Sequence, residues 1–408
     1  MLWEHAANWS EPGYEVPEVI AAWPVHGDPG NNEPSLIANF QDMDNDGLYE
    51  PDEGDMPAIK GDKALLVSVS DQKADTLTGI DPSMFDSQIL VHGYNGSTDP
   101  TLYETVFVTY TFTNRSDRTY DSVVVAVHSD VNIGGADDDF IGCDPELDMF
   151  YLYNTDPIDE SLFGSLGFGE HPPAMGIVGL SAPMRSFIYF NRVGSSIMND
   201  PRTTQDAAYY AEGRWKDGSP IINTVTNEPT RFMFNEYPDV PGGYHQTVAI
   251  SPDRRGTASF GPFFNVAPGG RICFDMAFVF ARDTTQDNIQ NTRVLQQKVI
   301  ALKEWYAQQG LGCDVYAPVG IPNADTVGQR LQLYPNPAQD QLRVVRAEIR
   351  EEMVVRITSV TGQTVREARW PSGTESMTLD VRTEANGVYM LSLVGATESS
   401  SQRFVVAR

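Results

Sequence analysis

The stretch Leu333-Tyr334-Pro335-Asn336-Pro337-Ala338 opens the part of the chain whose fold is easiest to infer. Pro335 and Pro337 each fix a φ angle and hold the preceding residue extended, so this segment cannot be helical. The segments after it alternate apolar and polar residues, and short turns separate them, of which Asn386-Gly387 is the strongest hairpin signal. Residues 331–408 are therefore expected to form a separate all-β domain. The expected strands are residues 341–346, 353–359, 364–368, 377–381, 388–393 and 402–406.

Short strands at this spacing are typical of a small Ig-like sandwich, and the pattern alone also fits a carbohydrate-binding or spacer module. Four segments carry a closer resemblance: 334–338, 360–365, 387–391 and 403–406. In order, spacing and terminal position they resemble the type A C-terminal sorting domain of the type IX secretion system in Bacteroidota-type Gram-negative bacteria. The residues that match the sorting signal are Tyr334, Pro335, Asn336, Pro337, Gly387, Tyr389, Arg403 and Val405.

The resemblance implies a partner and a location. The partner is the type IX secretion machinery, and the protein is expected to be secreted or held at the outer-membrane surface, usually after removal of the tail. Cargo of this pathway must first cross the inner membrane, yet Met1-Leu2-Trp3-Glu4-His5 has neither the basic nor the apolar region of a signal peptide. Either Met1 lies inside a longer protein or the signal has been removed, and we expect the former.

Composition excludes some classes of partner. The 56 acidic and 28 basic residues among 408 give a net charge of −28. A field of that sign repels nucleic acid and anionic membrane surfaces and attracts divalent cations. No apolar run approaches the roughly 18 residues of a transmembrane helix. Three cysteines cannot form a disulfide framework; one bridge plus one buried thiol would suit an oxidising compartment, and the pairing among Cys143, Cys273 and Cys313 is left open.

The segment from residue 42 to residue 53, DMDNDGLYEPDE, fits the twelve-residue calcium loop. Its carboxylates repel one another unless a cation neutralises them, and Gly47 permits the sharp turn that brings them together. Ca²⁺ suits a cage of many oxygens better than Mg²⁺ does. Because Pro51 and Pro57 disfavour an exiting helix, an isolated loop that pins the N-terminal segment is expected; the alternative is a solvated acidic turn. The expected ligands are Asp42, Asp44, Asp46, the Leu48 carbonyl, Glu50 and Glu53.

A second acidic segment follows the expected strand 122–128. Asp130 and Asn132 share a face by the period of two, and Gly134-Gly135 lets the chain fold back toward further aspartates. The segment fits either a second cation site or a solvated loop. The candidate ligands are Asp130, Asn132, Asp137 and Asp139.

The remaining chain is mainly β. We expect an irregular segment at 1–62, a large antiparallel β-sandwich body at 63–312, a linker at 313–330 and the sorting domain at 331–408. Residues 272–281 are apolar on both faces, so this strand should be central. Helical spacing and the following Gly310 predict one helix, at 286–309, that covers a face or an edge of the sandwich. The other expected body strands are 64–70, 88–92, 105–113, 122–128, 151–153, 175–181, 186–190 and 259–266.

Trp215 lies in an exposed-looking basic turn, RWKDGSP, within the loop-rich region 191–240. A loop tryptophan either packs the loop onto the core or stacks on a sugar ring, and both are kept open. The body itself resembles a recurring body of secreted proteins of unknown function that carry the same tail, which implies location and architecture but no activity. The matching segments are Asp44-Asn45-Asp46-Gly47, Ile59-Lys60-Gly61-Asp62, Ile141-Gly142-Cys143-Asp144 and Trp215-Lys216-Asp217-Gly218.

No G-x-S-x-G, H-E-x-x-H, P-loop or dinucleotide motif is present, and the six histidines show no ligand-like spacing. Two functions remain. The first is a calcium-stabilised, non-catalytic structural, adhesion or binding protein at the cell surface or beyond it, with glycans or other surface proteins as partners. The second is a secreted hydrolase acting on polysaccharide or protein, which would need two carboxylates facing each other across a cleft.

Overall fold

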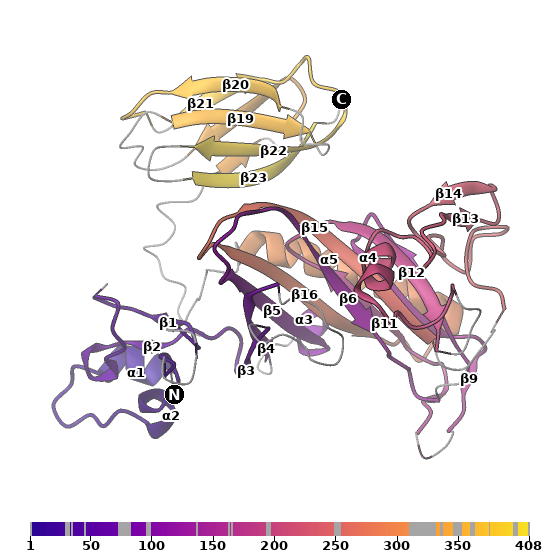
Figure 1. Ribbon diagram of the computed structural model, residues 1–408, viewed down its shortest axis with the longest axis horizontal. Helices are drawn as coiled ribbons and strands as arrows, with labels where there is room; N and C mark the ends of the chain where they lie inside the picture. Colours follow the sequence, from indigo (N-terminus) through magenta and orange to yellow (C-terminus); the bar gives the residue numbers. More distant parts are fainter. Residues whose placement is uncertain are drawn as a thin grey trace. The chain divides into compact units, whose positions relative to one another are not determined.

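Figure 1 shows the computed structural model of the chain, which forms two compact units, Met1–Val319 and Gly320–Arg408. The described residues are 2–28, 33, 36–44, 46–71, 83–94, 99–135, 138–161, 164, 166–192, 197–248, 254–309, 332–334, 338–345, 353–359, 364–374, 376–394 and 399–406. The secondary structure is mainly β, as predicted, in several antiparallel sheets.

The first unit is built on an antiparallel sheet of seven strands in the order β3-β4-β5-β16-β11-β8-β7. The strand that was predicted to be central, β16, is the middle strand of this sheet. Its alternate side chains enter two different cores: Phe274 and Met276 lie on one face, and Ala277 and Val279 lie on the other. The strands are β3 (Lys63–Ser70), β4 (Phe85–Gly93), β5 (Thr105–Asn114), β7 (Asp139–Asp144), β8 (Met149–Asn154), β11 (Ala174–Gly179) and β16 (Arg271–Ala281).

A three-stranded sheet packs on the inner face of this sheet and completes the sandwich. It consists of β12 (Met184–Asn191), β15 (Arg254–Val266) and β6 (Tyr120–Ser129), with β15 in the middle. Aromatic pairs join the two sheets. The ring centroids of Phe260 and Phe274 are 4.8 Å apart, and those of Phe150 and Phe187 are 5.1 Å apart. All four rings are fully buried, so they contribute much of the apolar surface that stabilises the sandwich.

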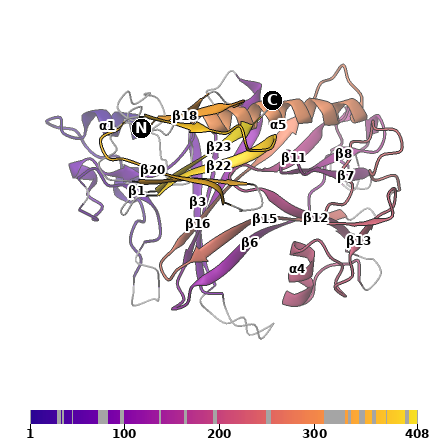
Figure 2. The same cartoon turned by 90° about the horizontal axis from the view of Figure 1, so that it is seen from above.

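Helix α5 (Asn288–Gln309) covers the outer face of the seven-stranded sheet, which makes the body a three-layer structure. In Figure 2, α5 and the three-stranded sheet lie on opposite sides of β11. Leu295, Val299 and Leu302 recur at intervals of four and three, so they form one apolar stripe, and all are fully buried against the sheet. The predicted covering helix is confirmed, and of the two predicted positions it occupies a face of the sheet and not an edge.

The N-terminal segment is less irregular than its sequence suggests, because it contains short elements. These are α1 (Leu2–Asn8), α2 (Glu18–Ala21), β1 (Phe40–Gln41), a 3₁₀ turn (Pro51–Glu53) and β2 (Met56–Pro57), of which β1 and β2 pair. Lys60 joins this segment to the body. Its ammonium is almost fully buried and lies 3.5 Å from the Asp275 carboxylate, which also accepts hydrogen bonds from Thr109 and Tyr306.

The region 191–240 holds three short elements that the sequence did not indicate. They are α4 (Thr204–Ala211) and the hairpin of β13 (Ile221–Asn223) and β14 (Glu228–Thr230). The Thr203 hydroxyl caps α4 by accepting from the Asp206 amide, which satisfies one of the free N–H groups at the helix start. Three further short elements occur in the body: α3 (Pro100–Tyr103) and the pair β9 (Ile158–Asp159) and β10 (Gly169–Glu170).

The second unit is a sandwich of two small antiparallel sheets around its own core. One sheet has the order β17-β18-β21 and the other β20-β19-β22-β23. The Trp370 ring is fully buried between them, and its indole nitrogen donates to the Thr374 carbonyl at 2.9 Å. The strands are β17 (Gln332–Tyr334), β18 (Gln341–Val345), β19 (Met353–Ser359), β20 (Thr364–Trp370), β21 (Ser376–Asp380), β22 (Gly387–Val394) and β23 (Ser399–Val406).

Two of the cysteines lie within the described residues. Cys143 is a free thiol, fully buried in the sandwich core, where its sulfur donates to the Met233 carbonyl and burial raises its pKa well above the usual value. Cys273 is half-buried and disulfide-bonded. Cys313 lies outside the described residues. Among the helices that the structure describes, none is both long and apolar enough to cross a membrane.

Candidate metal centre

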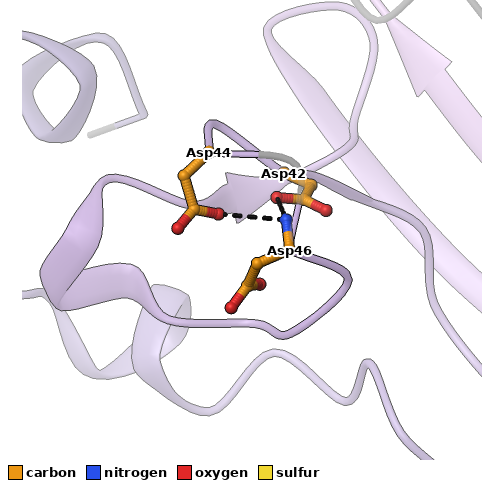
Figure 3. A group of neighbouring side chains, drawn as sticks. All are labelled: Asp42, Asp44 and Asp46. Carbon is orange, nitrogen blue, oxygen red and sulfur yellow. Dashed lines mark hydrogen bonds between the residues drawn. The ribbon is translucent and has the colours of Figure 1, made fainter.

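The carboxylates of Asp42, Asp44 and Asp46 converge at the predicted calcium loop (Figure 3). One oxygen from each lies within 4.8 Å of the others. The loop follows β1 directly and ends at the 3₁₀ turn before β2, so the β1–β2 pair holds its two ends together. Three carboxylates at such distances repel one another strongly in the absence of a counter-charge, and a hard cation is what such a group of oxygens binds.

Backbone amides hold the loop in this conformation. Asp42 accepts from the amide of Gly47 at 2.8 Å and from that of Asp46 at 3.2 Å, and Asp46 accepts from the amide of Leu48 at 2.7 Å. Gly47 has φ of +83°, which a residue with a Cβ adopts only with strain. The side chains thus turn the backbone around the point where their oxygens meet.

Asp55 closes the loop, although it lies beyond the twelve-residue template. Its carboxylate is almost fully buried and accepts from the Met43 amide at 2.8 Å and the Glu50 amide at 2.9 Å. Its carbonyl is 2.9 Å from the His5 ring nitrogen Nε2, which ties the loop to α1. Sequence reasoning missed this residue. The signal that could have found it is Gly54-Asp55, because Gly54 adopts φ of +108° and turns the chain back toward the loop.

Of the two glutamates among the predicted ligands, Glu50 lies in the field of the aspartates. The charge of Glu53 is the largest influence that raises the pKa of Glu50; burial follows, and then the charges of Asp46 and Asp44. Glu53 itself is exposed, at the end of the 3₁₀ turn. The group within 4.8 Å holds neither glutamate. Leu48 is exposed, as a residue contributing only its carbonyl would be.

The second predicted set of ligands is dispersed. Asp130 forms an ion pair with Arg255 at 2.9 Å, and Arg255 also reaches Asp200 at 2.6 Å. Asn132 is exposed. Asp139 is fully buried in β7 and accepts from the Ile133 amide at 2.8 Å. Asp137 lies outside the described residues.

Trp215 is half-buried and packs against the sandwich core. Its amide closes the turn by donating to the Ser219 carbonyl at 3.0 Å, and neighbouring Lys216 donates to the Asn199 side chain at 2.5 Å. These contacts hold the turn down on the body. Packing is therefore the role that the surroundings of this tryptophan favour over stacking on a sugar.

The predicted sorting residues that the structure describes lie on three strands of the second unit. Gly387 begins β22, and the Tyr389 ring packs on Phe404 with centroids 5.7 Å apart while its hydroxyl donates to the Ala385 carbonyl. Arg403 and Val405 lie on β23 and pair with β22. Tyr334 ends β17. Pro335, Asn336 and Pro337 lie outside the described residues.

Comparison with known proteins identifies the tail. No curated protein matches the chain. One of the solved structures that it resembles is a polysaccharide lyase, with a TM-score of 0.23 and 10% sequence identity over 79% of this chain and 34% of the lyase. A likeness that weak carries no argument. Residues 332–407, in contrast, match the secretion system C-terminal sorting domain. The second unit is therefore a type IX secretion C-terminal sorting domain, and the chain that carries it is a secreted or cell-surface protein.

Proposed function

We propose that the protein is exported by the type IX system and acts outside the cell as a calcium-stabilised, non-catalytic structural, adhesion or binding protein. The observation that carries the calcium part is the convergence of Asp42, Asp44 and Asp46 on one point while backbone amides hold their loop. Carboxylate and carbonyl oxygens suit Ca²⁺, and extracellular fluid supplies it at concentrations that weak extracellular sites use. Glu50, Glu53 and the Leu48 carbonyl are proposed to complete the ligand set.

The role proposed for the ion is to pin the N-terminal segment. The loop lies between β1 and β2, and Asp55 connects it to His5 in α1. An ion that binds the folded loop and not the unfolded chain raises the free energy of unfolding as its concentration increases. With a dissociation constant of about 0.1 mM, 10 mM Ca²⁺ would add about 2.7 kcal/mol.

The test is thermal unfolding of residues 1–408 with Ca²⁺ and with a chelator, for the wild type and for Asp44→Ala with Glu53→Ala. Tryptophan fluorescence is a suitable signal, because the Trp23 indole donates to the Asn39 carbonyl beside β1. We expect Ca²⁺ to raise the melting temperature of the wild type and not that of the double variant.

The matched control is Asp52→Asn, which removes one exposed carboxylate from the same turn without touching the group of three. Its response to Ca²⁺ should equal that of the wild type. An equal response to Ca²⁺ in the wild type and the double variant would refute the calcium loop and leave the export part standing.

A further inference from the structure

The two border strands of the seven-stranded sheet, β7 and β3, differ in how they are covered. At the β7 border, the Cys143 amide donates to the Phe234 carbonyl at 3.0 Å, and the Ile141 amide donates to the Gln246 side chain at 2.9 Å. These bonds satisfy backbone groups that a border strand otherwise leaves open, so no further strand can pair there.

The β3 border is open. This strand pairs with β4 alone (Figure 1), and seven of its eight residues are exposed. Among the described residues, none outside β4 forms a backbone hydrogen bond with the stretch Ala64–Val69. Border strands are commonly protected by several charges, a proline or a bulge, whereas β3 has only Lys63 at its start. Such an edge is a template for one more strand.

One face of β3 is also apolar. Leu65, Val67 and Val69 share this face, because alternate residues of a strand point the same way, and they are 63%, 41% and 52% exposed. In β4, Val91 lies opposite Leu65 and Ile89 lies opposite Val67, and both β4 residues pack on the sandwich core. The apolar surface therefore continues from the core to the border of the sheet, where it meets no further strand.

The strand is complementary to itself. A two-fold axis perpendicular to the sheet keeps each face on its own side, so residues that lie opposite each other must share a face. With the axis at Val67, this residue faces its own copy, and Leu65 of each copy faces Val69 of the other. In the same register Lys63 of each copy faces Asp71 of the other. Apolar residues thus meet apolar residues, and a cation meets an anion at both ends.

Asp71 is held in position for this contact. Its carboxylate accepts from the Ser83 amide at 3.0 Å and from the Phe85 amide at 2.6 Å, which fixes a negative charge directly after β3. A shift of two residues is the smallest that keeps the faces aligned, and it would place Lys63 opposite Val69 or beyond the strand. Exposed ion pairs add little affinity, so the two pairs mainly determine the register.

The net charge of −28 on each copy opposes association at long range. At physiological ionic strength, however, exposed charges more than about 8 Å apart are largely screened from one another. The strand that would form the contact has no acidic residue. Repulsion is therefore weak at the border itself.

We propose that β3 pairs with β3 of a second copy of this chain, which joins the two seven-stranded sheets into one continuous sheet across a two-fold axis at Val67. The pairing supplies hydrogen bonds to the open backbone and places the apolar side chains of the two strands beside one another. The proposal goes beyond the function proposed above and does not depend on the Asp42 loop.

The first test is the molar mass of residues 1–408, measured by analytical ultracentrifugation over a dilution series at physiological salt. The wild type should be a dimer that dissociates on dilution. Val67→Lys should be monomeric, because it places two like charges opposite each other on the axis. The matched control is Val225→Lys, at an exposed valine in the turn between β13 and β14, which should dimerise like the wild type.

Cross-linking tests the register. Val67→Cys should form a disulfide-linked dimer on a non-reducing gel, because the axis brings the two Cβ atoms to about 5 Å. Leu65→Cys is the matched control: it lies on the same face, but four residues, or about 13 Å, separate it from its own copy. Alone it should not cross-link, whereas combined with Val69→Cys it should.

Three results would overturn the proposal. The first is a wild type that stays monomeric at every concentration, which is also the result expected if a strand of another protein occupies this edge. The second is a dimer that Val67→Lys leaves intact. The third is equal cross-linking of Leu65→Cys and Val67→Cys, which would place the contact in another register. Circular dichroism shows whether each variant is folded; if Val67→Lys is not, the cysteine variants decide.

Discussion

His92 should make the stability of the body depend on pH. The imidazole lies in β4, is 5% exposed and stacks on Phe107 with ring centroids 5.3 Å apart. It lines a cavity of about 10 Å³ together with Lys60, Asp275 and Tyr306. Burial, and after it the positive charge of Lys60, together lower the pKa of His92 to about 4, against the opposing effect of Asp275.

The size of the effect follows from the difference between this value and the pKa of about 6.5 for histidine in an unfolded chain. Between these two values the unfolded state binds more protons than the native state, so the free energy of unfolding falls as the pH falls through the window. The loss is about 2 kcal/mol at pH 5 and approaches about 3 kcal/mol near pH 4. Because the side chain is almost fully buried, no reduction for solvent screening applies.

Urea unfolding of the wild type and of His92→Gln, each at pH 7 and pH 5, measures this loss. General charge effects of so acidic a chain are common to both proteins and cancel in the comparison. The wild type should lose about 2 kcal/mol more than the variant between the two pH values. His26→Gln, at an exposed histidine, should behave like the wild type. The same pH dependence in the wild type and in His92→Gln would refute the reasoning.

Lys60→Met should lower the free energy of unfolding by about 3–5 kcal/mol in urea at pH 7, because it leaves the buried Asp275 carboxylate without its cation. Lys63→Met, at an exposed position on β3, should change it by less than about 0.5 kcal/mol; equal effects would contradict the buried pair. Trp215→Ala should cost about 2 kcal/mol of stability and leave binding to polysaccharide gels unchanged, since the ring packs on the core. Unchanged stability with lost retention on the gel would favour sugar stacking instead.

Alternation of side chains was sufficient to predict most of the strands. The prediction of β16 came instead from a segment that is apolar on both faces, which enter different cores, and that of α5 from an apolar stripe with helical spacing. Alternation failed for β7, whose sequence DFIGCD contains two aspartates and a glycine although the strand is almost wholly buried. This segment forms a strand because it pairs with β8 and is buried between the layers. Neither contact can be inferred from the sequence of the segment itself.

The two groups of converging carboxylates, the Asp42 loop and the group of Asp138, Asp156 and Glu160, differ in the same way. The Asp42 loop is contiguous, so its spacing alone indicates its chemistry. Asp138, Asp156 and Glu160 come from three segments that meet through strand pairing and through glycine contacts with Asp159. The spacing of Asp130 fitted either a cation ligand or a solvated loop, and in the structure its carboxylate pairs with Arg255, which lies far along the chain on β15.

The central place of β16 also determines when the body can fold. Its neighbours in the sheet, β5 and β11, are synthesised before β16, but both pair with β16 and not with each other. In the sequence of the body, only α5 follows β16. The inner core lacks Phe274 and Met276, and the outer face lacks α5, until nearly the whole unit has been synthesised. Long-range pairings of this kind form slowly. The inner and outer cores of the body can therefore be completed only after both β16 and α5 have been synthesised.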